Sequence, residues 1–198
     1  NDGSMLATGD NEGKTRIYDV KTEEKIHEFK HDGAVWSVAF SNDGSMLATG
    51  DEANKTTIYD VKTEEKIHEF KHDKTVFSVA FSNDGSMLAT VDWTNKTTIY
   101  DVKTEEKIYE FKHDGAVFSV AFSNDGSMLA TGDQAFKTTI YDVKTKEKIY
   151  EFKHDGPVGS VSFSNDGSLL ATGDSKNKTI IHGNGESKYQ KDWIKSKY

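Results

Sequence analysis

The sequence predicts an all-β fold, a β-propeller of about five four-stranded sheets arranged around a central axis. Two observations lead to this prediction. The string Asn-Asp-Gly-Ser recurs every 41 residues, beginning at Asn1, Asn42, Asn83, Asn124 and Asn165. Each repeat unit also alternates short β-branched and aromatic runs with Asn, Asp and Gly turns. A period of about 40–45 residues with strand-like content is typical of propeller blades.

The second unit shows the four strands expected in each sheet, at residues 34–40, 45–50, 56–61 and 66–71. The first is β-branched, aromatic and small with almost no charge, as expected of an inner strand buried on both faces. An Asn-Asp-Gly turn follows it, and the fourth strand is the most charged, which suits an outer edge. Ile67 and Phe70 in the fourth strand are three residues apart. Strict alternation would place them on opposite faces, so either both faces pack or a bulge intervenes.

Counting strands along the chain indicates an incomplete seam. Residues 1–182 form the blades, but the first unit lacks its inner strand, so the counts are three, four, four, four, and three or four. Residues 183–198 form a diverged tail. A ring of five blades would lack one strand, and three alternatives stay open: the tail supplies it, a second chain supplies it, or residues are absent from this sequence. An open array would expose sheet faces, and we expect it to form a homo-oligomer through the open seam.

Composition excludes several classes of protein. The 198 residues suffice for one domain or one repeat array, and 11% aromatic residues indicate a packed core. The formal net charge of −8 disfavours nucleic acid and anionic membranes as partners, because an acidic surface repels phosphate. The chain has no cysteine, which excludes disulfides and thiolate zinc sites.

At these residues the chain resembles the WD-repeat β-propeller family. A blade of that family runs from a His-containing loop through an inner strand ending in Phe-Ser, an Asp-Gly turn, a Leu-Ala-Thr-Gly strand and a third strand ending in Trp-Asp. The second unit carries the matching pieces at His31-Asp32, Val38-Ala39-Phe40-Ser41, Asn42-Asp43-Gly44, Leu47-Ala48-Thr49-Gly50 and Tyr59-Asp60. The resemblance covers residues 1 to about 182, with Tyr-Asp in place of Trp-Asp. In the last unit, Ile181 and His182 are read at the Tyr-Asp place.

The resemblance also implies a structural hydrogen-bond network. Family members often join a loop His, a strand Ser or Thr, the Trp and a turn Asp. Here the usual turn Asp is missing, and an Asp two residues earlier is expected to accept from the His or the Tyr hydroxyl, because buried His and Tyr need partners. A strand Thr is available nearby, at Thr49, Thr90, Thr131 and Thr172. The expected members are His31, Asp51, Tyr59, His72, Asp92, Tyr100, His113, Asp133, Tyr141, His154 and Asp174.

The positions that differ between units concentrate in two loops, before the first strand and after the second strand of each blade. Because strands alternate in direction, both loops lie at one end of the sheet, and we call this end the variable rim. The turns at the opposite end barely change, although Lys146 replaces a Glu in one of them. Large aromatic residues on exposed loops are typical binding anchors. The candidate binding residues are Trp36, Glu52, Asn54, Lys74, Phe77, Trp93, Thr94, Phe118, Gln134, Phe136 and Pro157.

The variable rim favours a non-catalytic scaffold that binds a protein or peptide. Three other interpretations stay open. In the first, the exposed loops vary in sequence without any function. In the second, the chain is lectin-like and holds a glycan in equivalent pockets between blades. In the third, it is a truncated or engineered repeat propeller without a natural partner.

Catalysis and metal binding are not expected. The acidic residues recur once per blade, which indicates a structural role rather than an enzyme. His27, His68, Tyr109 and Tyr150 occupy one repeat position, and a metal-ligand set would not tolerate that exchange. We therefore expect no metal and no cofactor. The chain opens without a signal-peptide pattern, which favours the cytoplasm over secretion, and its first residue is Asn, which suggests a processed chain or a fragment.

Overall fold

The computed structural model describes residues 2–183, which form 18 β-strands in five antiparallel sheets. The first sheet contains β1 (Met5–Gly9), β2 (Lys14–Asp19) and β3 (Lys25–Lys30). The second contains β4 (Val35–Phe40), β5 (Met46–Asp51), β6 (Lys55–Asp60) and β7 (Lys66–Lys71). The third contains β8 (Val76–Phe81), β9 (Met87–Asp92), β10 (Lys96–Asp101) and β11 (Lys107–Lys112). The fourth contains β12 (Val117–Phe122), β13 (Met128–Asp133), β14 (Lys137–Asp142) and β15 (Lys148–Lys153), and the fifth contains β16 (Val158–Phe163), β17 (Leu169–Asp174) and β18 (Thr179–Gly183).

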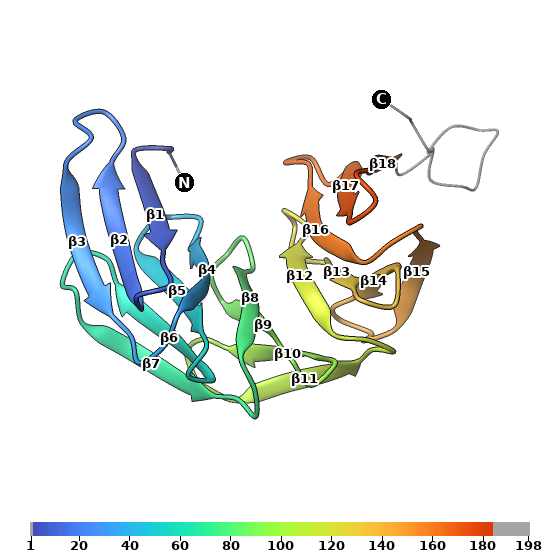
Figure 1. Ribbon diagram of the computed structural model, residues 1–198, viewed down its shortest axis with the longest axis horizontal. Helices are drawn as coiled ribbons and strands as arrows, with labels where there is room; N and C mark the ends of the chain where they lie inside the picture. Colours follow the sequence, from blue (N-terminus) through green and yellow to red (C-terminus); the bar gives the residue numbers. More distant parts are fainter. Residues whose placement is uncertain (1, 184–198) are drawn as a thin grey trace.

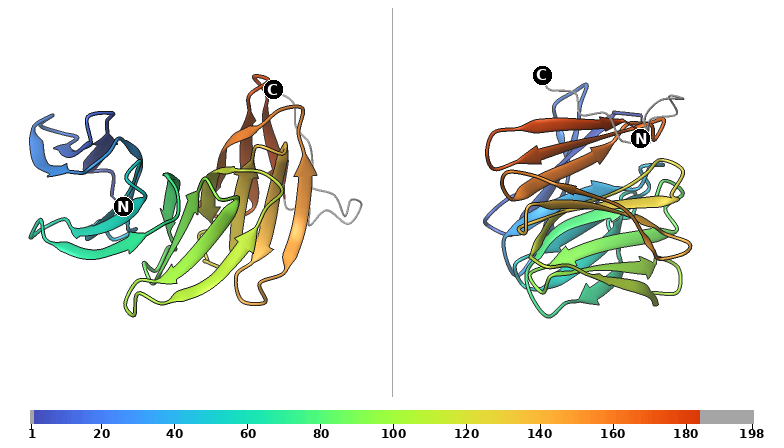
Figure 2. Two further views of the ribbon diagram at one scale, coloured as in Figure 1. Left: turned by 60° about the horizontal axis from the view of Figure 1, so that its bottom comes forward. Right: turned by 90° about the vertical axis from the view of Figure 1, so that its right-hand side faces the viewer.

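The five sheets follow an arc, with β4, β8, β12 and β16 on its concave side (Figure 1). Within each sheet the strands lie in chain order, so each sheet is a simple meander. The close contacts between sheets join neighbours along the chain, and the first and last sheets lie at the two open ends of the arc (Figure 2, left). The all-β, blade-like arrangement predicted from the repeats is therefore confirmed, and the described part of the chain forms an open arc rather than a closed ring.

The open arc bears on the alternatives for the seam. The described sheets contain three, four, four, four and three strands. A closing strand from the diverged tail was one alternative, and residues 184–198 of that tail lie outside the described residues. In the described residues no helix is long and apolar enough to cross a membrane.

The outer strand of each of the first four sheets contains a β-bulge. In the second sheet, Ile58 pairs with His68 while Tyr59 pairs with Lys66, so Ile67 is the extra residue. Phe70 is buried in the core while Ile67 is exposed, so the outer strand does not pack on both faces. The same register shift recurs in the first, third and fourth sheets. A bulge on an edge strand also disturbs the row of free backbone groups that would otherwise invite pairing with another chain.

The core lies between successive sheets rather than inside any one of them. Leu47 on β5 packs with Ile17 and Phe29 of the preceding sheet, and Val61 joins the same cluster. The leucines at the corresponding position of later sheets are equally buried, with 0% exposure at Leu47, Leu88, Leu129 and Leu170. Leu6 holds this position in the first sheet, faces the open end of the arc and is 54% exposed. Packing between successive sheets therefore supplies the hydrophobic core.

Candidate functional site

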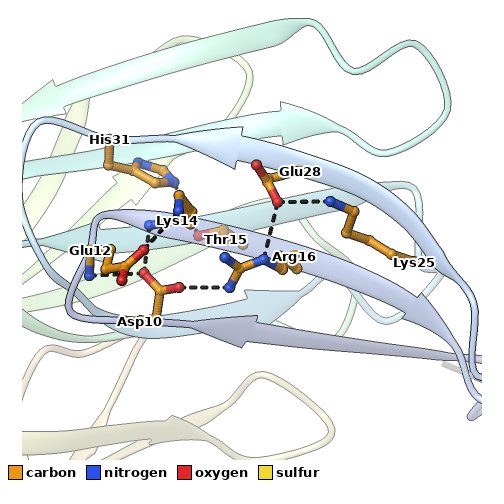
Figure 3. Close-up of polar contacts among 8 residues, drawn as sticks. All are labelled: Asp10, Glu12, Lys14, Thr15, Arg16, Lys25, Glu28 and His31. Atoms are coloured by element: carbon orange, nitrogen blue, oxygen red, sulfur yellow. Dashed lines mark hydrogen bonds and ion pairs between the residues drawn. The ribbon is translucent and has the colours of Figure 1, made fainter.

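A histidine at the end of each outer strand is held by a threonine of the same sheet. His31 Nε2 lies 3.0 Å from Thr15 Oγ1, and Figure 3 shows this pair in the first sheet. The corresponding pairs in the next three sheets are 2.9 Å apart, at Thr56–His72, Thr97–His113 and Thr138–His154. These threonines are the second residues of β2, β6, β10 and β14, the third strand of each repeat unit, whereas the sequence had suggested the second-strand threonines at 49, 90, 131 and 172. The pairing register between the two strands determines which threonine reaches the histidine. Thr15 lies opposite Phe29, and Phe29 is two residues before His31.

The other side of each histidine ring faces the next sheet. The rings of His31 and Tyr59 lie 5.9 Å apart and nearly perpendicular, and His31 Nδ1 lies 3.8 Å from Asp51 Oδ2. His72 repeats both contacts with Tyr100 and Asp92. These His–Asp distances exceed hydrogen-bond length. The Asp51 carboxylate instead accepts a hydrogen bond of 2.9 Å from the Lys55 backbone N–H. The expected His, Tyr and Asp therefore gather at the first two junctions, with the ring contact more direct than the carboxylate contact.

Sheets at the two ends of the array depart from this arrangement. Among residues 2–183 no histidine from an earlier sheet faces Asp10, and Arg16 donates to the Asp10 carboxylate at 2.6 Å and to Glu28 at 3.1 Å (Figure 3). At the last junction, His182 pairs with Leu170 as Tyr141 pairs with Leu129. Thus His182, not Ile181, occupies the tyrosine position. Its ring lies 5.9 Å from that of His154 in the same perpendicular geometry.

Burial controls the electrostatics of the junctions. Loss of solvent lowers the pKa of His31 and His72, and lowers that of His113 to about 4. The same cause raises the pKa of Asp51 and raises that of Tyr141 to about 12. At neutral pH the histidine and tyrosine are therefore uncharged, which suits rings packed between sheets. In the described residues no group of three His, Cys, Asp or Glu side chains could hold a metal ion.

A hollow of about 210 Å³ opens beside the first junction, lined by Lys30, His31, Asp32, Asp51, Lys55, Thr57, Tyr59, Lys66 and Glu69. Four of its charged groups form two ion pairs. Lys55 Nζ lies 2.7 Å from Asp32, and Lys66 Nζ lies 3.0 Å from Glu69. A charged ligand would have to displace these ion pairs, so we treat the hollow as part of the junction.

Four predicted rim aromatics from three sheets form one continuous cluster, which we call the aromatic cluster: Trp36, Phe77, Trp93 and Phe118. Ring centroids lie 5.7 Å apart for Trp36–Phe77, 4.9 Å for Phe77–Trp93, and 6.2 Å for both Phe77–Phe118 and Trp93–Phe118. Tilted and edge-to-face rings at these distances attract one another. The two tryptophans remain 54% and 49% exposed.

The remaining rim residues frame this cluster or lie beyond it. In the second to fifth sheets the two loops of the variable rim are joined by backbone hydrogen bonds, such as those from Glu52 N to Ala34 O and from Ser175 N to Pro157 O. Glu52, Lys74 and Gln134 are exposed, Asn54 and Pro157 are half-buried, and Thr94 donates to Asp92. Phe136 is exposed with a positive φ of 66° and lies outside the aromatic cluster. Gly159 occupies the aromatic slot of the fifth sheet, so the cluster does not continue there.

Sequence reasoning missed a third set of contacts, which joins the outer surfaces of neighbouring sheets. His27 Nδ1 lies 2.9 Å from Glu64 Oε1, and His68 Nδ1 lies 2.8 Å from Glu105 Oε1. At the next junction Tyr109 replaces the histidine, and Lys146 Nζ lies 5.0 Å from the centre of its ring. The sequence contained a sign of this contact. Tyr109 replaces the histidine and Lys146 replaces the glutamate, and the two exchanged residues meet at the same junction.

Comparisons with known proteins agree with this fold. The family model described as the IFT122 first beta-propeller matches residues 1–197. Among solved structures, the Cps50 (Swd1) beta-propeller domain of Myceliophteria thermophila superposes with a TM-score of 0.86 at 16% identity. That match covers 98% of this chain and 67% of the other, and at such low identity it shows the fold alone. No curated protein matches the chain.

Proposed function

The chain belongs to the IFT122 first beta-propeller family of WD-repeat proteins, and on this premise we propose that it is a non-catalytic scaffold that binds a protein or peptide through its variable rim. The aromatic cluster is the observation that carries the proposal. Its four rings come from three sheets, and the two exposed tryptophans lie in positions that differ between otherwise similar units.

The aromatic cluster has the properties of a binding anchor. Exposed tryptophan is costly in water, and a contiguous group of rings offers a large apolar area whose side chains lose little conformational freedom on binding. The rings already contact one another, so their side chains are ordered before a partner binds. Glu52 and Lys74 stand exposed on the same rim and can provide a polar border around an apolar centre.

The overall charge supports a protein partner over a nucleic acid. The chain carries a formal net charge of −8, and the candidate rim residues include one acidic and one basic side chain. A surface without a basic patch cannot offset phosphate repulsion. An apolar or aromatic segment of a protein is the partner that the aromatic cluster fits best.

The test is a selection of peptides from a displayed random library on the intact chain. Peptides enriched on the wild type should bind the double variant Trp36→Ala/Trp93→Ala at least about tenfold more weakly, because hot-spot aromatics contribute about 2 kcal/mol or more. Affinity of the selected peptides, measured by isothermal titration calorimetry, is the readout.

Tyr150→Ala provides the matched control, since it removes an exposed ring from the outer strand β15 and leaves the variable rim intact. Selected peptides should bind this control as they bind the wild type. Equal binding to the wild type and the double variant would show that the aromatic cluster is not the docking surface.

We also propose that the open arc self-associates through its first sheet. Leu6 and Val20 are 54% and 53% exposed there, whereas their counterparts in the second sheet, Leu47 and Val61, are covered by the preceding sheet.

The solution molar mass tests this proposal. The molar mass of the wild type should exceed that of one chain, and Leu6→Lys should return it to the monomer value. Ile26→Lys, on the outer strand β3, should leave the mass unchanged. A monomeric wild type rules out the proposal.

A further inference from the structure

A second hollow lies at the opposite end of the sheets from the variable rim. It has a volume of about 200 Å³ and is lined by Phe40, Asn42, Phe81, Ser82, Asn83, Phe122, Ser123 and Asn124. The three phenylalanines are the last residues of β4, β8 and β12, and the three asparagines follow in the turns. Three successive sheets therefore each contribute a phenylalanine and an asparagine to one site, and two of them add a serine.

The turn beside this hollow does not need its asparagine. Gly85 N donates to Ser82 O at 2.9 Å, and the Ser82 hydroxyl donates to Asp84 at 2.6 Å while accepting from Met87 N. These contacts close the turn through its backbone, the serine and the aspartate. Within the described part of the chain, the carboxamides of Asn83 and Asn124 make no hydrogen bond, and both residues are exposed. Asparagine nevertheless stands at this position in every unit.

The chemistry of the lining selects a class of ligand. No charged side chain is among the lining residues that the structure describes, so nothing in the hollow would offset a ligand's charge. A carboxamide offers both donors and an acceptor, which suits a ligand rich in hydroxyl groups. Phenylalanine rings offer apolar surface to the C–H faces of such a ligand. At about 200 Å³ the hollow is smaller than the roughly 300–1,000 Å³ of pockets for drug-sized molecules, and it suits one ring.

We propose that this hollow binds a single ring of a neutral sugar, with Asn83 as the central hydrogen-bonding residue. Asn83 lies on the middle of the three contributing turns, between Asn42 and Asn124 in the order of the sheets. The proposal does not depend on the protein-binding rim, because Trp36 and Phe40 lie at opposite ends of β4.

The experiment titrates the intact chain with glucose, galactose, mannose and N-acetylglucosamine by calorimetry, with glucuronate and glucosamine as charged comparators. At least one neutral sugar should bind saturably and more tightly than either charged sugar. Asn83→Ala should weaken that binding about tenfold, because it removes hydrogen bonds worth roughly 1.4 kcal/mol in total. Asn83 is exposed, so the variant should keep the wild-type circular dichroism spectrum.

The fifth unit offers a matched control. Asn165→Ala makes the same change in the same turn, and Asn165 does not line this hollow. This variant and Trp36→Ala/Trp93→Ala should both bind sugar as the wild type does. The proposal is overturned if no neutral sugar binds saturably, if a charged sugar binds as tightly, if Asn165→Ala weakens binding as much as Asn83→Ala, or if the rim variant loses binding.

Discussion

Replacing Leu88 with alanine is expected to lower the free energy of unfolding by about 2–5 kcal/mol. Leu88 is fully buried between the second and third sheets, in a cluster with Ile58, Phe70 and Val76. Truncation removes apolar contacts and leaves a cavity that rigid sheets on both sides cannot fill. Equilibrium denaturation in urea measures the change.

The repeat supplies the ideal control for this prediction. Leu6→Ala makes the same chemical change at the same repeat position, but Leu6 is 54% exposed. Because Leu6 lies on the proposed self-association surface, both variants are compared at a protein concentration low enough to keep the chain monomeric. Its expected effect on the free energy of unfolding is within about 0.5 kcal/mol. If the two variants are destabilised equally, packing between successive sheets is not the main source of stability.

Acidification from pH 6.5 to about pH 4 is expected to destabilise the fold through its junction histidines. Burial lowers the pKa of His113 to about 4, whereas in the unfolded chain it returns to its ordinary value of 6.5. Within this window the unfolded state binds more protons than the folded state, so the free energy of unfolding falls as the pH falls. For His113 alone the loss amounts to about 3 kcal/mol. His31 and His72, whose pKa values burial also lowers, act in the same direction.

A variant isolates this contribution. In His113→Gln the free energy of unfolding should fall less steeply between pH 6.5 and pH 4 than in the wild type, because one proton-binding group is gone. Burial raises the pKa of Asp133, so this carboxyl binds a proton more readily in the folded state and opposes part of the loss in both proteins. Parallel stability profiles for the wild type and the variant would contradict the prediction.

The repeats made the fold predictable, since 41-residue periodicity and turn chemistry together define one meander and its copies. Details that depend on pairing register were not predictable. The spacing of Ile67 and Phe70 indicated a bulge or two packed faces, and only the pairing of Ile58 with His68 distinguishes these. Likewise, several threonines lie near each histidine in sequence, and the register between β2 and β3 determines that Thr15 reaches His31.

The candidate site was also predictable only in part. Alternating strand direction sufficed to predict that the loops before the first strand and after the second strand share one end. Whether their side chains touch depends on the distance between neighbouring sheets, which no single unit encodes. Trp36, Phe77 and Phe118 start successive inner strands and meet, together with Trp93. Phe136 belongs to the same kind of loop as Trp93, yet it lies apart from them.

The paired exchange of Tyr109 and Lys146 restricts how such an array can gain or lose units by recombination between its near-identical copies. Loss of the second unit would place His27 opposite Glu105, which preserves the original type of pair. Loss of the third would instead bring His68 against Lys146, and duplication of the third would bring Tyr109 against a glutamate. The N-terminal half of the gene can therefore change length without harm at this contact, whereas crossover at the third unit breaks a matched pair.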